Sequence, residues 1–555
     1  MKEFGRDKPG RRGALRWMLP PLIGALLLAA CGGGGDTTSS EGDGKPKSGG
    51  TLTVARESEA NGYNLMRDTA HPMVIFSVYD PLLVKDLDEE IRPYLAESLK
   101  SNDALTEWTI KLRPNVKFHD GTPFNADALR QIVDIQKSPA SRTAAAYMVV
   151  DSLTVVDELT AVYKMKSPNA GFPGLLADIY SVPFSPTAFN AKGAEYGNTP
   201  VGTGPFVLET WQRDSLLVLK KNPNYWRPGL PYLDQVNFKP IPDEDARLAA
   251  LNAGDMDAIF TVRQAQNVKK AAEGGAVKNY PDIGNITAST LFNMGRPPTD
   301  DKRVRRALGY ALKQEDLIAV QGLEGVAPVV TQLFAKQSPF YSEDAAKRYA
   351  MNNVTEAKKL MNEYINDPNR SDGKPVGTRV NLGVFTATAG VATLNDLVVL
   401  YQQKWRDVGA DIELGLVDQA VLSSKSVGKP PDFKADFDVT LSRSGSNEDP
   451  DNYLYNYLYN PKGGSNTVDM DNAELRRLLD LGRTIKGDER EKVYQQVSAL
   501  LAEEMPFIFH GALATAVGAK PEVKNLSELS FPEGGVKAKG HPSAQIKFTE
   551  VWLDR

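Results

Sequence analysis

The chain has 555 residues, which is too long for one ordinary hydrophobic core and favours roughly three or four domain-sized units. The composition fits a globular protein, with 41% hydrophobic and 24% charged residues. The net charge of -5 gives no sign of the basic surface that nucleic-acid binding needs. The single cysteine excludes an intramolecular disulfide and a metal cluster built on several thiolates.

The N-terminus carries a short apolar stretch behind a basic segment. Trp17–Ala30 is uncharged, and its length fits the core of a signal peptide but is short for a bilayer span. The stretch ends in Leu28–Cys31, which resembles the bacterial lipobox, where cleavage precedes an acylated cysteine. We therefore predict a lipoprotein signal peptide over residues 1–30 and a lipid on Cys31. An uncleaved anchor helix is the alternative, and two adjacent arginines in the basic segment leave twin-arginine export open.

A polar stretch separates this signal from the rest of the chain. Gly32–Gly50 contains no aromatic and no aliphatic residue, so it cannot bury enough apolar surface to offset the entropy of ordering it. We predict a flexible tether over residues 31–48. A lipid and a spacer would hold either a receptor or a surface enzyme beside a membrane.

The first predicted elements after the tether are strands. Thr51–Ala55 and Trp108–Leu112 alternate apolar and polar residues, as half-buried strands do. Asp120-Gly121 is a turn signal and predicts a hairpin in the segment that follows the tryptophan strand. Asn125 then caps a predicted helix with one apolar face. That face consists of Leu129, Ile132, Val133 and, as a polar exception, Gln136.

Helix signals continue along the chain and alternate with strand patterns, which indicates an α/β fold. Asn353 stands three residues before Glu356, and Asp471 stands three residues before Glu474, both as in a capping box. A basic cluster straddles the apolar positions of another predicted helix, so we interpret it as a solvated helix face. The cluster consists of Lys302, Arg303, Arg305 and Arg306.

Several longer motifs occur in a fixed order. They are Pro93–Leu99, Val116–Leu129, Pro200–Phe206, Lys221–Trp226, Ala246–Phe260, Phe292-Asn293 with Asp301–Leu312, Gln402–Leu414 and Glu448–Tyr453. Together they resemble the signature of extracellular solute-binding family 5, the peptide-, dipeptide- and nickel-binding receptors of ABC importers. The resemblance covers roughly residues 49 to 550.

The resemblance implies an α/β, two-lobed periplasmic-binding-protein-like fold of type II, with an extra subdomain inserted in the first lobe. A ligand would bind between the lobes and select the closed state, which the importer permease would then read. The implied parts are a first lobe from 49–82, 198–287 and 512–555, a subdomain from 83–197, a second lobe from 288–511, and hinges near Thr287–Phe292 and Phe507–Ala512.

The late acidic motif bears on the ligand. In peptide-binding members, an aspartate in the pattern Trp-x-Gly-Asp-Asn-x-Asp-Pro pairs with the ligand's α-ammonium group. Aligned on Asp449–Asn452, this chain has Arg443 at the tryptophan position and Ser446 at the aspartate position. A serine cannot neutralise a buried ammonium group, and an unpaired buried charge is costly. The resemblance therefore disfavours an ordinary peptide with a free amino terminus.

Two interpretations of this motif stay open. Arg443 either binds a carboxylate or phosphate of the ligand, because its fork suits such groups, or pairs with Glu448 or Asp449. A displaced anion for a cationic ligand would otherwise come from Glu57, Glu59, Glu448 or, after a one-residue shift, Asp449. The candidate ligand-binding residues are Glu57, Glu59, Phe292, Asn293, Arg443, Ser444, Gly445, Ser446, Asn447 and Asp449.

Catalytic and metal motifs are missing from the sequence. There is no Gly-x-Ser-x-Gly elbow, no His-Glu-x-x-His and no Walker phosphate loop. The histidines lack paired spacing, so we predict no metal and no cofactor; they are His71, His119, His510 and His541.

We predict an exported, lipid-anchored binding protein rather than an enzyme. It would be a monomer that faces the extracytoplasmic side and has permease subunits and a small solute as partners. The alternatives are a tethered hydrolase and a sensing lipoprotein for an oligosaccharide, a modified peptide or a metal chelate.

Overall fold

The structure is a computed structural model of the chain. It describes residues 44–68, 71–141, 143–261, 265–387, 392–417, 421–422, 425–426, 435–444, 449–455, 467–542 and 546–555. Contacts divide the chain into two units, Met1–Gly42 and Asp43–Arg555, and the description below concerns the second. The predicted signal peptide and Cys31 lie outside the described residues. Within these residues, no helix combines the length and the apolarity that a membrane span needs.

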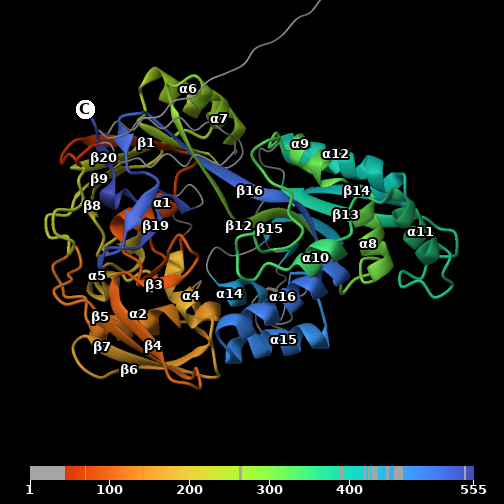
Figure 1. Ribbon diagram of the computed structural model, residues 1–555, viewed down its shortest axis with the longest axis horizontal. Coiled ribbons are helices and arrows are strands. Elements are labelled where there is room, and N and C mark those ends of the chain that lie inside the picture. The colour runs from red at the N-terminus through yellow and green to blue at the C-terminus, as the bar shows by residue number, and fades with distance from the viewer. Residues whose placement is uncertain are drawn as a thin grey trace, which may run out of the picture. The chain divides into compact units, whose positions relative to one another are not determined.

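A mixed ten-stranded sheet runs through this unit (Figure 1). β1 is parallel to β10 and β11, and β13 is parallel to β14 and β15, whereas β12 and β16 are antiparallel to each other. The predicted α/β class is therefore confirmed, and so is the first predicted strand. In spatial order the strands are β14 (Ala410–Val417), β13 (Val380–Ala387), β15 (Val439–Ser444), β12 (Lys278–Phe292), β16 (Phe507–Ala519), β11 (Ala258–Thr261), β1 (Thr51–Arg56), β10 (Gln235–Pro240), β9 (Leu216–Lys221) and β8 (Phe206–Gln212).

The two longest strands, β12 and β16, join the two halves of the sheet. Their pairing runs from Lys278 opposite Ala519 to Leu291 opposite Phe507. At one end β16 pairs with β11, and at the other end β12 pairs with β15. The register shifts between Ile283 and Thr287 and again beside Ala288, which is where one predicted hinge begins.

The first half of the sheet packs on a large apolar cluster built around β1, β9 and β10. A second sheet, in the order β4-β5-β7-β6, belongs to the same cluster. Its strands are β4 (Ala96–Ser101), β5 (Glu107–Leu112), β7 (Thr160–Met165) and β6 (Val150–Val155). The helices here are α1 (Pro72–Val78), α2 (Ala126–Gln136), α3 (Ala144–Tyr147), α4 (Phe172–Ala177), α5 (Pro186–Lys192), α6 (Glu244–Ala253) and α7 (Ala265–Glu273), with 3-10 turns η1 (Ile179–Ser181), η2 (Gly193–Asn198) and η5 (Phe548–Glu550).

Three two-stranded ribbons complete this part of the structure. They are β2 (Leu83–Lys85) with β3 (Ile91–Pro93), β17 (Val523–Lys524) with β20 (Trp552–Leu553), and β18 (Glu528–Ser530) with β19 (Lys537–Lys539).

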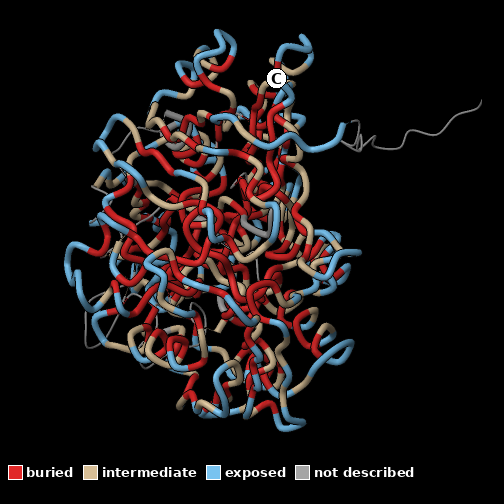
Figure 2. The backbone as a smooth tube through the Cα atoms, turned by 90° about the vertical axis from the view of Figure 1, so that its left-hand side faces the viewer, coloured by how far each residue is buried: buried red, intermediate tan, exposed pale blue. Residues whose placement is uncertain are grey.

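The second half of the sheet has its own apolar clusters. Figure 2 colours the backbone of the whole chain by burial and shows the buried segments in the interior. Trp405 is fully buried, stacks on Tyr401 with ring centroids 4.7 Å apart, and donates its indole N–H to the Leu308 carbonyl at 3.0 Å. The helices are α8 (Lys302–Tyr310), α9 (Gln314–Val320), α10 (Glu343–Arg348), α11 (Val354–Ile365), α12 (Ala392–Arg406), α14 (Pro450–Leu454), α15 (Ala473–Thr484) and α16 (Gly487–Glu504).

Local signals in the sequence had mixed success. Asn125 and Asn353 cap α2 and α11 as predicted, because each side chain accepts a hydrogen bond from a backbone N–H three residues on. The cap of α15 was predicted one residue too early, since Asn472 and not Asp471 accepts from the Leu475 N–H. The turn at Asp120-Gly121 exists, but it closes only an isolated bridge between Lys117 and Pro123 rather than a regular hairpin.

The basic cluster on α8 is a solvated face only in part, since Lys302 is exposed but the arginines are half-buried or buried. Arg305 is 1% exposed and donates to the backbone carbonyls of Thr299, Asp300 and Glu504. Arg303 is half-buried between the carboxylates of Asp301 and Asp367. The prediction failed for the arginines because the start of α8 packs against the end of α16, a contact between distant parts of the sequence.

Candidate functional site

The carboxyl ends of parallel strands from both halves of the sheet converge on one stretch of β12 and β16. In the first half, β11 ends at Thr261, opposite Ala516. In the second half, β15 ends at Ser444, opposite Thr287, and Thr287 itself faces Ala512. Ligands of open α/β sheets bind in the crevice outside the carboxyl ends of the strands, at the point where the strand order reverses. The strand register therefore places the candidate site beside the stretch where β12 and β16 pass from one half of the sheet to the other. We call this stretch the crossing of β12 and β16.

A hollow lies at this crossing. Its volume is about 370 Å³, and its lining is mostly apolar with several polar groups. The lining residues are Ile283 and Thr287 of β12, Ala512 of β16, Tyr341, and the segment from Pro328 to Gln337.

Two glutamines fasten that segment in place. Gln314 accepts from the Val330 N–H at 2.7 Å and donates to the carbonyls of Val330 and Phe509 at 2.8 and 2.6 Å. Gln332 makes a reciprocal pair with the backbone of Ser342, at 2.9 Å in each direction. Both side chains are buried. Because amide side chains offer the same kinds of donor and acceptor as backbone groups, Gln314 ties Val330 to Phe509 of β16, and Gln332 ties the segment to Ser342. Sequence reasoning missed both, since neither belongs to a motif.

Two predicted site residues follow β1. Glu57 is half-buried at the carboxyl edge of the sheet, and within the described residues its side chain has no ion-pair partner. Glu59 is engaged, because its carboxylate accepts from Arg56, from the Trp211 indole at 3.3 Å and from the backbone N–H of Ala60 at 2.8 Å. Burial would raise the pKa of Glu59, but these hydrogen bonds and the Arg56 charge outweigh it and lower the pKa.

Phe292 and Asn293 lie in the interior rather than on an open surface. Phe292 is fully buried in the apolar cluster of the second half and faces Trp405 at 6.5 Å. Asn293 donates to the Ala435 carbonyl at 3.1 Å and accepts from the Gly295 N–H at 3.1 Å. Both side chains therefore have partners within the protein, and their contact with a ligand stays a prediction.

The late acidic motif is described only in part. Arg443 and Ser444 lie in β15, where their backbones pair with Ala288 and Thr287. Gly445, Ser446, Asn447 and Glu448 lie outside the described residues. The structure nevertheless places the two ends of this segment, at Ser444 and Asp449.

Asp449 and Asp451 form two buried ion pairs with arginines of α15 and α16. Both Asp449 oxygens accept from Arg490 at 2.7 Å, and both Asp451 oxygens accept from Arg483 at 2.8 Å. Burial would raise the pKa of Asp449, but the Arg490 guanidinium outweighs it and holds the pKa below its usual value. We call these four residues the Asp–Arg clamp. The clamp argues against Asp449 as the anchor of a ligand ammonium group, because its charge is already neutralised.

His510 lies on β16 beside the crossing but does not face an open site. Its Nε2 is 2.8 Å from both the Thr290 hydroxyl and the Tyr401 hydroxyl, and the ring is 2% exposed. Burial lowers the pKa of His510 to about 3, so the ring is neutral at pH 7. The His510 side chain therefore has a structural role in the interior.

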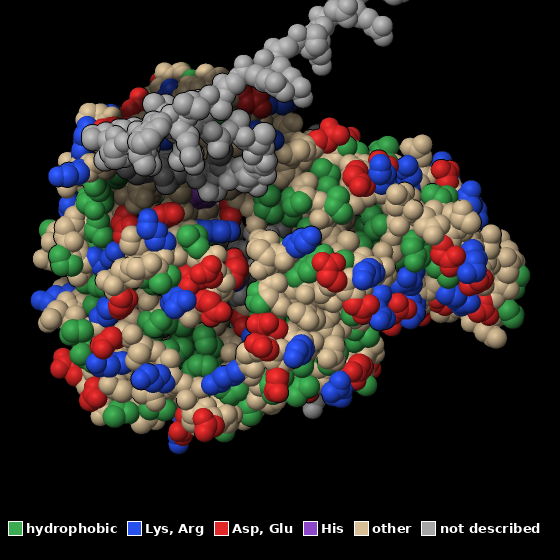
Figure 3. All heavy atoms as spheres, viewed as in Figure 1, with side chains coloured by type: hydrophobic (Ala, Val, Ile, Leu, Met, Phe, Trp, Pro, Cys, Tyr) green, Lys and Arg blue, Asp and Glu red, His purple; other side chains and the backbone are tan. Residues whose placement is uncertain are grey.

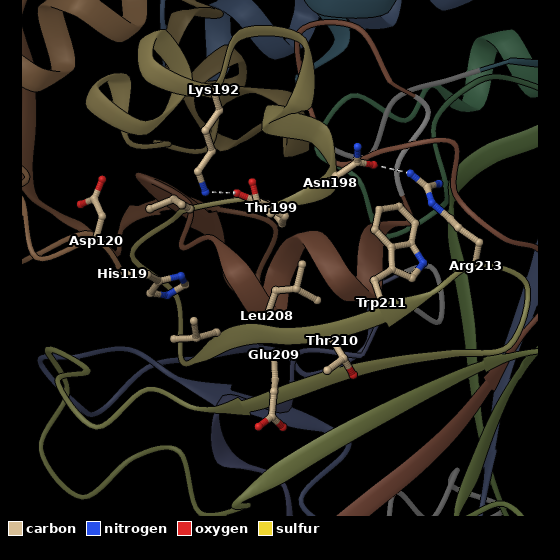
Figure 4. Close-up of a pocket in the computed structure, with 13 residues that line it drawn as sticks. His119, Asp120, Lys192, Asn198, Thr199, Leu208, Glu209, Thr210, Trp211 and Arg213 are labelled. Carbon is tan, nitrogen blue, oxygen red and sulfur yellow. Dashed lines mark hydrogen bonds between the residues drawn. The ribbon is translucent and has the colours of Figure 1, made fainter.

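A second hollow, of about 680 Å³, lies beside β8 (Figure 4). Its cations already have protein partners: Lys192 donates to the Thr199 carbonyl at 3.3 Å, and Arg213 donates to Asn198 and lies 3.5 Å over the Trp211 ring. It lies at β8, the edge strand of the sheet, and not at the crossing of β12 and β16. We therefore keep the crossing as the candidate site.

The surface carries no sign of nucleic-acid binding on the face in Figure 3, where acidic and basic side chains are interspersed. Among the described residues, no three His, Cys, Asp or Glu side chains are grouped as metal ligands. In the described part of the chain, the candidate site is thus a hollow with an apolar lining and several polar groups, at the junction of the two halves of the sheet.

This sheet, crossed by two long strands with a hollow beside them, is the architecture of two-lobed periplasmic binding proteins. The chain belongs to the bacterial extracellular solute-binding proteins, family 5, whose profile matches residues 90–465. It is therefore a solute-binding protein and not an enzyme, which confirms both the predicted family and the predicted fold class.

One relative matches most of the chain, and another matches about half of it. The oligopeptide-binding protein AppA of Bacillus subtilis is 27% identical over 531 residues, 92% of each chain. The glutathione-binding protein GsiB of Shigella flexneri is 32% identical over 263 residues, 46% of this chain, and the match spans only 50% of that relative.

Solved structures match the fold. The AppA structure from Bacillus subtilis in complex with a nonapeptide has a TM-score of 0.74 at 23% identity and covers 92% of this chain and 100% of its own. The binding protein AgaA in complex with agropinic acid, from A. tumefaciens R10, has a TM-score of 0.76 at 22% identity and covers 91% and 99%.

Proposed function

We propose that this protein captures a peptide or similar polar solute between two lobes and delivers it to the permease of an ABC importer. The observation that carries the proposal is the convergence of strand carboxyl ends from both halves of the sheet on the hollow at Thr287 and Ala512. The relatives AppA and GsiB, which are named for oligopeptide and glutathione binding, support a ligand of this class.

The proposed lobes follow the expected boundaries. The first consists of residues 49–82, 198–287 and 512–555, the second of 288–511, and the inserted subdomain of 83–197. Closure would bend the chain near Thr287–Phe292 and Phe507–Ala512. Among the described residues, β12 and β16 are the strands that join the halves there, and the register shifts in their pairing are a natural place for bending.

The chemistry of the site favours Glu57 as the partner of an ammonium group on the ligand. The serine at position 446 is neutral, and the Asp449 charge is neutralised by Arg490. Glu57 supplies a carboxylate at the carboxyl edge of β1 with no ion-pair partner within the described residues. The apolar lining from Val329, Leu333 and Phe334 suits a side chain or another apolar group of the ligand.

The lipid on Cys31 and the tether over residues 31–48 complete the proposal. Acylation would hold the receptor at the extracytoplasmic face of the membrane, and the tether would give it the reach to collect solute and dock as a monomer.

The test begins with mass spectrometry of solute released by denaturing the purified mature protein. Calorimetry then measures free and N-acetylated synthetic peptides of two to nine residues. If Glu57 pairs with the ammonium group, Glu57→Gln weakens free peptides about tenfold or more and leaves acetylated peptides unchanged. Glu522→Gln, which removes the same charge from an exposed site, is the control and should change neither.

The outcomes separate the parts of the proposal. No released solute and no binding of peptides, sugars or chelates would overturn solute capture. Tight binding of free dipeptides that survives Glu57→Gln would refute the role of Glu57 while leaving solute capture intact.

A further inference from the structure

The inserted segment touches the second half of the molecule at the start of α4. The backbone N–H of Ala170 donates to the carbonyl of Arg483, a clamp residue, at 2.8 Å. Figure 1 shows α4 beside α14, the helix that begins directly after Asp449. Two segments more than 270 residues apart in the chain therefore meet at the Asp–Arg clamp.

Two glycines make this approach possible. A Cβ atom added to Gly174 would lie 2.3 Å from the Asp449 Cβ and 3.1 Å from its backbone nitrogen, and one added to Gly171 would lie 2.9 Å from an Asp449 oxygen. Neither glycine has a positive φ, so its backbone conformation suits any residue. The space left by the clamp, and not the backbone conformation, therefore requires glycine at both positions.

The clamp presents a fixed surface to these glycines. Besides its ion pairs, Arg490 donates through Nε to the Gly482 carbonyl at 2.9 Å, and the Arg483 guanidinium lies 3.1 Å from the centroid of the Tyr455 ring. The side chains of Asp449 and Arg490 are each 9% exposed. Contact with α4 contributes to that burial, and an ion pair gains strength when water is excluded.

A second contact joins the same two parts. Lys486, between α15 and α16, donates to the Ser101 hydroxyl at the end of β4 and lies 5.5 Å from the centroid of the Trp108 ring. The side of the inserted segment that faces the clamp is thus held at two separate places.

We infer that the contact between α4 and the Asp–Arg clamp is a latch that holds the protein closed around its solute. The inference rests on the proposed function. Opening would expose two ion pairs to water and weaken them, and closing restores them, which gives the closed state a contact that needs no ligand atom.

Gly174→Ala tests the latch, because its methyl group would overlap Asp449 only when α4 is docked. Small-angle X-ray scattering without ligand should show a larger radius of gyration for this variant than for the wild type. The tightest wild-type binder of the peptide panel should lose about tenfold in affinity, since fewer molecules reach the closed state. Gly274→Ala is the control, because its Cβ would meet only an ordinary contact at 3.5 Å.

Lys486→Glu provides a second variant at an exposed position, which avoids a folding defect, and should shift scattering and affinity in the same direction. Wild-type scattering and affinity in both variants, with circular dichroism confirming the fold, would overturn the latch. If the wild type binds no peptide, the proposed function fails on its own, and the ligand-free scattering still decides the latch: expansion supports it and an unchanged radius refutes it.

Discussion

Removing one partner of the Asp449–Arg490 pair should destabilise the protein strongly. Arg490→Gln keeps a polar side chain but leaves the Asp449 carboxylate without a counter-charge in a site where both side chains are 9% exposed. The variant also loses both hydrogen bonds of 2.7 Å between the guanidinium and the carboxylate. For a buried pair broken on one side, the expected loss in the free energy of unfolding is about 3–5 kcal/mol.

The assay is urea denaturation at pH 7, followed by far-ultraviolet circular dichroism. A double-mutant cycle with Asp449→Asn separates the pair from the individual side chains, and the double variant should be more stable than Arg490→Gln alone, because no unpaired charge remains. Arg477→Gln is the control, since Arg477 pairs with Glu474 on the same face of α15 with both side chains more than half exposed, and it should cause no measurable change.

The result that refutes this reasoning is an Arg490→Gln variant within about 1 kcal/mol of the wild type, the range expected for an exposed pair. A second check comes from acidification. Without Arg490, burial should raise the pKa of Asp449, so the deficit should shrink as the pH falls and the carboxylate takes up a proton.

Two further predictions concern acid stability and the membrane. Burial lowers the pKa of His71 and His510 to about 3 and that of His119 to about 4, whereas these side chains have a pKa near 6.5 in the unfolded chain. As the pH falls below 6.5, the unfolded chain therefore takes up protons that the folded protein does not. Each histidine lowers the free energy of unfolding by about 2 kcal/mol at pH 5. His510→Gln should therefore lose less stability than the wild type between pH 7 and pH 5 in urea titrations, and an equal loss would contradict the buried neutral ring; Asp80, whose pKa burial raises to about 7, acts in the opposite direction in both proteins. Cys31→Ala should move the protein from the membrane to the soluble fraction on fractionation while solute affinity stays unchanged, and a variant that stays with the membrane would refute the lipid anchor.

The sequence by itself determined the fold class, the family and several local structures. The alternation of Thr51–Ala55 predicts β1, and Asn125 and Asn353 predict the starts of α2 and α11. These features depend on residues within one turn or one strand, so a short stretch of sequence contains the whole cause. The motifs spread from residue 49 to 550 sufficed for the family because each is local and their order is fixed.

Only the tertiary structure decided what the charged residues and the glycines do. Asp449 and Arg490 are 41 positions apart, and α4 reaches them from a still more distant part of the chain. Arg305 is buried because α8 meets the end of α16, although its sequence neighbours suggest an exposed face. Burial and ion pairing depend on which elements pack together, and a local pattern carries no information about a partner that another element supplies.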